Sequence, residues 1–127
     1  MNILIVDDEP NLVRVTVVAL HSLGHHTFIA RTADAARQLL EAEEIDAVFL
    51  DLNLNGESGY PFLSQLVDQA IRAPVILFTA HAREEVEEEA LRRGAFDCLV
   101  KPFTLDDLRK QMDRIEKFHR LKADRGV

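Results

Sequence analysis

Ile3-Leu4-Ile5-Val6-Asp7-Asp8 opens the chain with an apolar run that ends in two carboxylates. Three further apolar runs end in a polar residue: 47–50 before Asp51, 75–78 before Thr79, and 98–100 before Lys101. Short apolar runs that each close on a polar side chain are typical of buried parallel strands. In open α/β sheets the carboxyl ends of such strands converge on the ligand site. The sequence therefore predicts carboxylates, a hydroxyl and an ammonium group in one cleft.

Helical patterns alternate with these strands along the chain. We expect strands at residues 2–6, 26–30, 46–50, 74–78 and 97–100, and helices at 10–23, 33–43, 60–70, 84–93 and 104–121. Pro10 fits a first helical turn, and Thr32 and Thr104 fit N-cap positions. The alternation indicates an α/β fold, a doubly wound five-stranded parallel sheet of (βα)5 type. We expect this domain to span residues 1–121 and to be followed by a short tail, 122–127.

The strand order decides which of the polar groups meet. The flavodoxin-like order 2-1-3-4-5 is usual for such a sheet. It places Asp7 and Asp8 on one side of Asp51 and Thr79 on the other, with about 4.8 Å between neighbouring strands. Lys101 starts roughly 10 Å away, two strands along, and its flexible stem can close most of that distance.

Electrostatics then indicates the chemistry of the site. Three carboxylates this close cannot all stay ionised without a cation, and Lys101 alone supplies too little positive charge. Mg²⁺ fits, because one or two carboxylates, waters and a phosphate oxygen usually hold it. A metal, a lysine and a hydroxyl around one carboxylate form a receptor for a phosphoryl group. Asp51, at the centre, is the predicted nucleophile and would become an aspartyl phosphate.

Composition sets the outer limits. The chain has 127 residues, of which 47% are hydrophobic and 29% charged, as in one globular domain. Its net charge of −7 disfavours direct nucleic-acid binding. A single cysteine, Cys98, excludes an internal disulfide, and we assign His21, His25 and His26 to the surface rather than to a metal site. No apolar stretch reaches the ~20 residues of a membrane span, so we expect a cytoplasmic protein without membrane contact.

The motifs together resemble the response-regulator receiver domain of two-component signalling, the CheY-like family, over about residues 1–121. The matching stretches are Val6-Asp7-Asp8-Glu9-Pro10, Leu50-Asp51-Leu52-Asn53, Gly59, Phe78-Thr79-Ala80, and the run 94–103 with Lys101-Pro102. Each of these is weak alone. Their order and their placement at strand ends make the resemblance specific.

The resemblance implies a phosphorylatable switch rather than an enzyme with a separate substrate. Asp51 would accept a phosphoryl group from a sensor histidine kinase or a phosphotransfer protein, in a self-catalysed transfer. Asp8 and Asp51 would bind Mg²⁺ through their side chains, Asp7 through water, and Asn53 through its main-chain carbonyl.

Other residues take their roles from the same resemblance. Thr79 and Lys101 would bind the phosphoryl oxygens, and the Lys101–Pro102 peptide bond would be cis. His81, with Asn53, would line the path of the hydrolytic water and tune the lifetime of the phosphate. Phosphorylation would then change the conformation of the face formed by strand 4, helix 4, strand 5 and helix 5.

Two positions depart from the family pattern. Cys98 stands where the family usually has a Tyr or Phe that rotates inward on phosphorylation, and a cysteine is too small to replace that ring. Leu54-Asn55 stands where Met-Pro is common. Because Asn tolerates turn conformations, we expect an altered loop with unchanged chemistry.

Several alternatives remain open. The chain could be the receiver of a larger regulator of transcription, a phosphate-independent pseudo-receiver that binds a partner, or part of a homodimer. An enzyme of the flavodoxin kind would need a Ser/Thr/Gly phosphate loop, where Asp7-Asp8-Glu9-Pro10 stands here. A haloacid-type phosphatase would need a second Asp at position 53, which is Asn53.

Overall fold

The computed structural model describes residues 1–69, 73–80 and 84–124. Within these residues a five-stranded parallel sheet has the spatial order β2-β1-β3-β6-β7. Its strands are β1 (Asn2–Val6), β2 (His26–Ala30), β3 (Ala47–Asp51), β6 (Val75–Thr79) and β7 (Asp97–Val100). The observed order confirms the predicted 2-1-3-4-5 arrangement, since β4 and β5 form a separate hairpin.

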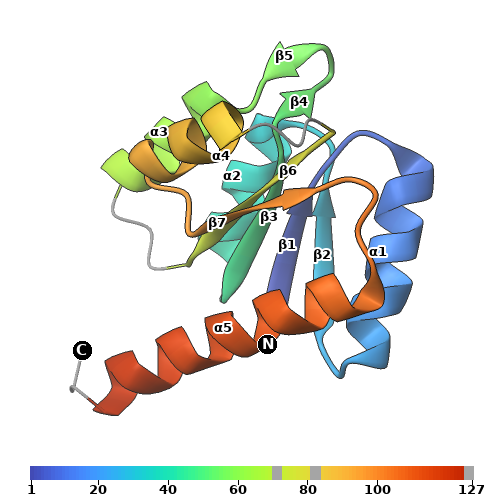
Figure 1. The fold of residues 1–127 in the computed structure, drawn as a ribbon, viewed down its shortest axis with the longest axis vertical. Helices are drawn as coiled ribbons and strands as arrows, with labels where there is room; N and C mark the ends of the chain where they lie inside the picture. The colour runs from blue at the N-terminus through green and yellow to red at the C-terminus, as the bar shows by residue number, and fades with distance from the viewer. Residues whose placement is uncertain (70–72, 81–83, 125–127) are drawn as a thin grey trace.

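Helices cover both faces of this sheet (Figure 1). They are α1 (Pro10–Ser22), α2 (Ala33–Ala42), α3 (Tyr60–Asp68), α4 (Glu84–Arg92) and α5 (Leu105–Asp124). The helices α1 and α5 lie on one face, and α2, α3 and α4 lie on the other. None of the described helices is both long enough and apolar enough to cross a membrane.

The alternation of side chains along each strand builds a core on either side of the sheet. Ile3 of β1 points to the α1/α5 side, where it joins a cluster that contains Leu20 and Ile115. Its neighbour Leu4 points to the opposite side and joins Leu63 of α3. Because both faces are covered, β1 and β3 are apolar at successive positions, which explains why the short runs are the strongest signal in the sequence.

Local signals set the helix ends as predicted. Thr32 caps α2, with its Oγ1 accepting a hydrogen bond from the Ala35 N–H at 3.1 Å. At the start of α5, Thr104 and Asp107 form a reciprocal capping box: the Asp107 N–H donates to Thr104 Oγ1 at 3.1 Å, and the Thr104 N–H donates to the Asp107 carboxylate at 2.8 Å.

Some predicted boundaries were wrong by a few residues. Asp51 and Thr79 are the last residues of β3 and β6, rather than the first residues after them. The helix α5 continues to Asp124, beyond its predicted end at 121, so the first part of the predicted tail is helical. The surface assignment of His25 was also wrong, because this side chain is buried and its Nδ1 lies 3.0 Å from the Met1 amino group.

The segment between β3 and α3, where no strand was predicted, contains a small antiparallel hairpin, β4 (Asn53–Leu54) and β5 (Glu57–Ser58). Its two-residue turn has a positive φ at both Asn55 (54°) and Gly56 (78°). This is the pattern of a type I′ turn, for which Asn-Gly is the preferred sequence. The hairpin stands at the carboxyl edge of the sheet, beside the end of β3 (Figure 1).

Candidate functional site

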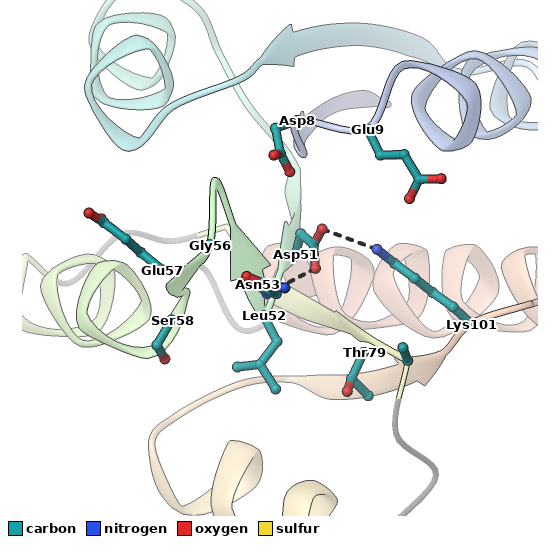
Figure 2. A pocket seen from close by; sticks show the side chains of 11 residues that line it. Asp8, Glu9, Asp51, Leu52, Asn53, Gly56, Glu57, Ser58, Thr79 and Lys101 are labelled. Atoms are coloured by element: carbon teal, nitrogen blue, oxygen red, sulfur yellow. Dashed lines mark hydrogen bonds and ion pairs between the residues drawn. The ribbon is translucent and has the colours of Figure 1, made fainter.

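A cleft of about 610 Å³ opens at the carboxyl edge of the sheet. The cleft is lined by five predicted site residues: Asp8, Asp51, Asn53, Thr79 and Lys101. The remaining lining residues are Glu9, Leu52, Gly56, Glu57, Ser58 and Ala80. Figure 2 shows Asp51 at the centre, with Lys101 and Asn53 reaching it from different segments.

Contacts at both oxygens hold the Asp51 carboxylate. Its Oδ1 accepts a hydrogen bond from the Asn53 N–H at 3.0 Å, and its Oδ2 accepts one from Lys101 Nζ at 3.1 Å. The side chain is 8% exposed, on the wall of the cleft. The stem of Lys101 thus closes the predicted gap across β6, and the carboxylate is oriented before any ligand arrives.

Asp7 lies deeper than the other two acids and is fully buried. Its Oδ1 accepts a hydrogen bond from the Glu9 N–H at 3.0 Å. Its Oδ2 lies 3.5 Å from Lys101 Nζ but has no hydrogen-bond partner among the described residues. Burial, reinforced by the negative charge of Asp51, raises the pKa of Asp7 to about 6. The ammonium of Lys101 therefore does not balance this group of acids.

The three carboxylates meet the requirements of a hard divalent cation. Asp7, Asp8 and Asp51 each offer an oxygen atom, and these atoms lie within 4.8 Å of one another. An all-oxygen set with room for water on the cleft side suits Mg²⁺. The unpartnered oxygen of Asp7 and the raised pKa of this residue both indicate a missing positive charge. The residues present therefore fit the predicted ion.

Thr79 and Lys101, the predicted phosphoryl-binding residues, also lie close together. Thr79 is 2% exposed at the end of β6, and its main-chain carbonyl accepts a hydrogen bond from the Lys101 N–H at 2.7 Å. The Lys101–Pro102 bond is cis, as the resemblance implied. The two residues therefore flank Asp51 from the side of β6 and β7.

The absence of a side chain at Gly59 allows the segment between the hairpin and α3 to approach the end of β3 closely. Its N–H donates to the Leu52 carbonyl at 2.6 Å. A Cβ at this position would lie 2.5 Å from the Asp51 main-chain oxygen, far inside van der Waals contact. Only glycine fits without a shift of the segment that carries Asp51.

Three of the predicted roles are not decided by these contacts. Asn53 contacts Asp51 through its N–H, and its carbonyl as a metal ligand stays a prediction. His81 lies outside the described residues. Cys98 is partly buried against the same core cluster as Tyr60, and burial raises the pKa of its thiol to about 11. It is a neutral packing residue at pH 7, and its effect on switching stays a prediction.

Sequence reasoning missed one contact at the edge of the site. The Asn55 N–H donates to Oδ2 of Asp8 at 3.2 Å, from the tip of the hairpin. The Asn55-Gly56 dipeptide was the signal that could have revealed this turn.

Comparison with known protein families gives one match that covers most of the chain. A family model described as the response regulator receiver domain matches residues 3–113. Among curated proteins, the regulatory protein AtoC of Escherichia coli (strain K12) is 37% identical over 122 residues, which are 96% of this chain and 26% of AtoC. The transcriptional regulatory protein BasR of the same organism is 34% identical over 119 residues, or 94% of this chain and 54% of BasR.

Solved structures show the same similarity. A crystal structure of NtrX from Brucella abortus superposes with a TM-score of 0.89 at 32% identity, covering 98% of this chain and 29% of that one. The receiver domain of the Francisella response regulator 1452 gives a TM-score of 0.85 at 26% identity, covering 93% of this chain and 98% of that one. The chain thus spans about a quarter of AtoC and NtrX and about half of BasR.

Proposed function

Because this chain belongs to the response regulator receiver domain family, we propose that it accepts a phosphoryl group on Asp51 and changes conformation in response. One arrangement carries the proposal. Lys101 Nζ lies 3.1 Å from Asp51, and oxygens of Asp7 and Asp8 lie within 4.8 Å of an oxygen of Asp51. Nucleophile, cation site and phosphoryl-binding groups thus share one cleft.

Asp51 supplies the nucleophile. An oxygen of its carboxylate forms the new bond to phosphorus while the bond from phosphorus to the donor's histidine nitrogen breaks, and the histidine keeps that electron pair. Lys101 is placed to bind an oxygen of the transferred group, and the hydroxyl of Thr79 is the second predicted donor. Both donors act on charge that shifts onto the phosphoryl oxygens during the transfer.

Asp8 and Asp51 would hold Mg²⁺ directly, Asp7 through water, and Asn53 through its carbonyl. The chemistry that Mg²⁺ supplies is neutralisation of charge on the carboxylates and phosphoryl oxygens. Its presence would also compensate the buried charge of Asp7, which Lys101 balances only in part. Receiver domains are not classical enzymes, so self-catalysed transfer and dephosphorylation are part of this proposal.

The partner we propose is a sensor histidine kinase or a phosphotransfer protein. The relatives AtoC and BasR are regulatory proteins longer than this chain, which supports a role as the receiver of a transcription regulator. A segment of the sensor histidine kinase RcsC of Salmonella typhi is also similar, at 34% identity over 112 residues. We place the receiver at residues 1–121 of a cytoplasmic protein. The face formed by β6, α4, β7 and α5 would change conformation on phosphorylation, and a homodimer could form in response.

Acetyl phosphate, a small donor, tests the proposal without knowledge of the kinase. With Mg²⁺, the intact mass should increase by one phosphoryl group, and chelation of Mg²⁺ with EDTA should prevent this. Asp51→Asn should remain unmodified. A cooperative melting transition should show that this variant is nevertheless folded. If the wild-type protein stays unmodified with acetyl phosphate and with several phosphorylated kinases, the phosphate-independent pseudo-receiver becomes the better account.

A further inference from the structure

The tip of the β4–β5 hairpin ties three segments of the chain together through one residue. The main-chain N–H of Asn55 donates to Asp8 Oδ2 at 3.2 Å, and its side-chain Nδ2 donates to the carbonyl oxygen of Arg31 at 2.9 Å. Asp8 follows β1 and Arg31 follows β2, so the turn is attached to both loops at this edge of the sheet. The φ of 54° at Asn55 turns its N–H and its side chain to these two acceptors at once.

Each acid of the site receives a main-chain N–H. Glu9 provides it for Asp7, Asn53 provides it for Asp51, and Asn55 provides it for Asp8. The first two donors lie two residues from their acceptors and are local, whereas Asn55 is 47 residues from Asp8. The position of Asp8 therefore depends on the hairpin, while the other two carboxylates are held by their own loops.

Asp8 has the greatest need for such a donor. It is the most exposed of the three acids, and both of its acidic neighbours are buried within a few ångströms of it. Repulsion from these neighbours favours rotation of the Asp8 side chain into solvent, away from the cation site. A hydrogen bond to one oxygen opposes this rotation and leaves the other oxygen available.

We propose that Asn55 is a positioning residue for cation binding, which acts by holding Asp8 through its N–H and by anchoring the turn to Arg31. This inference rests on the proposed function of the cleft as a Mg²⁺ site. Donors behind a ligating carboxylate typically change metal affinity 10- to 100-fold. Because the turn is exposed, we expect the lower end of that range, about tenfold.

Three substitutions compare the N–H with the shape of the turn. Asn55→Pro removes the donor, because proline has no N–H, and it also changes the backbone conformation, since its ring fixes φ at about −65° where Asn55 has 54°. Asn55→Gly keeps the N–H and accepts a positive φ, and it removes only the bond to Arg31. Gly56→Ala strains the neighbouring position at a φ of 78° but keeps the Asn55 N–H, and its Cβ would meet nothing within 4 Å. Mg²⁺ binding is measured by isothermal titration calorimetry.

We expect about tenfold weaker Mg²⁺ binding in Asn55→Pro and a loss of less than about threefold in the other two variants. An Asn55→Pro affinity within twofold of wild type would overturn the inference, and so would equal losses in Asn55→Pro and Gly56→Ala. Absence of Mg²⁺ binding by the wild-type protein would overturn the proposed function as well. If the wild-type protein binds Mg²⁺ and Asn55→Pro binds it equally well, only the role of Asn55 would be overturned, and the proposed function would stand.

Amide hydrogen exchange gives a second test that does not depend on the folding of Asn55→Pro. The Asn55 amide should exchange faster in Asp8→Ala than in the wild-type protein without Mg²⁺, because its acceptor is gone. The amides of the Asn53–Ser58 pair should be unchanged, since the hairpin itself remains. Equal exchange at Asn55 in both proteins would show that the contact with Asp8 does not hold the turn, and would overturn the inference.

Discussion

Lys101 Nζ lies 3.1 Å from Oδ2 of Asp51, although 50 residues separate them in the sequence and β6 lies between their strands. The sheet order produces this contact: β3, β6 and β7 are consecutive neighbours, and all three end at the same edge. The long lysine stem spans β6, and the ammonium also lies 3.5 Å from Asp7. One positive charge therefore lies beside two carboxylates. The negative charge that remains can be neutralised by Mg²⁺ or by a proton.

Mg²⁺ should raise the melting temperature of the wild-type protein. An ion that binds only the folded state stabilises it by mass action, and the effect grows with the concentration of free ion. In Asp8→Ala the increase should disappear, because this variant lacks one of the two proposed direct side-chain ligands. Differential scanning calorimetry at several millimolar concentrations of Mg²⁺ checks this, with Asp106→Ala on the exposed start of α5 as a matched acidic control. A wild-type melting curve indifferent to Mg²⁺ would argue against a metal site.

Without Mg²⁺, stability should fall as the pH rises through about 6. The pKa of Asp7 is raised from 3.8 to about 6 in the folded state, chiefly by burial. The folded protein keeps this proton after the unfolded chain has lost it, so its contribution is complete below about pH 4 and is lost above the folded pKa. At about 1.4 kcal/mol per pKa unit, the contribution amounts to roughly 3 kcal/mol.

Asp7→Asn isolates this effect from the other carboxylates. Urea unfolding of both proteins in EDTA should show the variant gaining stability relative to wild type between about pH 4.5 and pH 7.5. Mg²⁺ should reduce the difference by stabilising the ionised carboxylate. Parallel stability curves for the two proteins would mean that Asp7 titrates as an ordinary aspartate in the fold.

Gly59→Ala should impair both folding and phosphorylation. The added Cβ would lie 2.5 Å from the Asp51 main-chain oxygen, so the segment before α3 must shift, with a loss of about 1–3 kcal/mol. Gly24→Ala is the matched control, because its φ of 89° strains alanine while no atom lies within 4 Å of the Cβ. Chemical denaturation should show both variants destabilised. Only Gly59→Ala should slow labelling by acetyl phosphate, and equal labelling rates in the two variants would contradict the account.

Phosphorylation should alter the segment after β6 more than β7. Thr79 would be drawn toward the new phosphoryl oxygens, and it ends the strand that leads to α4. Cys98 lacks the volume of a ring that could follow it. Hydrogen exchange with and without beryllofluoride, a phosphoryl mimic, should change most at residues 79–90, and Asp51→Asn should show no change. A maximum at residues 96–100 would contradict this route.

The sequence predicted the fold well because its strongest signals are local and redundant. Runs such as Ile3–Val6 are apolar at successive positions because the sheet is covered on both faces. Thr32 and Thr104 mark helix starts through side-chain hydroxyls that accept hydrogen bonds from nearby N–H groups. The polar residues at the strand ends lie together at the carboxyl edge of the sheet, as the predicted strand order requires.

The errors have physical reasons as well. The hairpin was missed because β4 and β5 are two residues each, too short for periodicity to show, although Asn55-Gly56 carried the turn signal. The burial of His25 depends on a contact with the Met1 amino group, 24 residues away, which no local pattern encodes. The link from Asn55 to Asp8 likewise depends on how two loops meet in space.

The chemical identity of the modified residue tests the central claim most directly. The protein is phosphorylated with acetyl phosphate and Mg²⁺, reduced with borohydride, digested and sequenced by mass spectrometry, so that an aspartyl phosphate appears as homoserine. We predict homoserine at position 51 alone, and none when Mg²⁺ is chelated. Homoserine at Asp7 or Asp8, or a phosphoryl group on a hydroxyl or histidine side chain with Asp51 unmodified, would contradict the account.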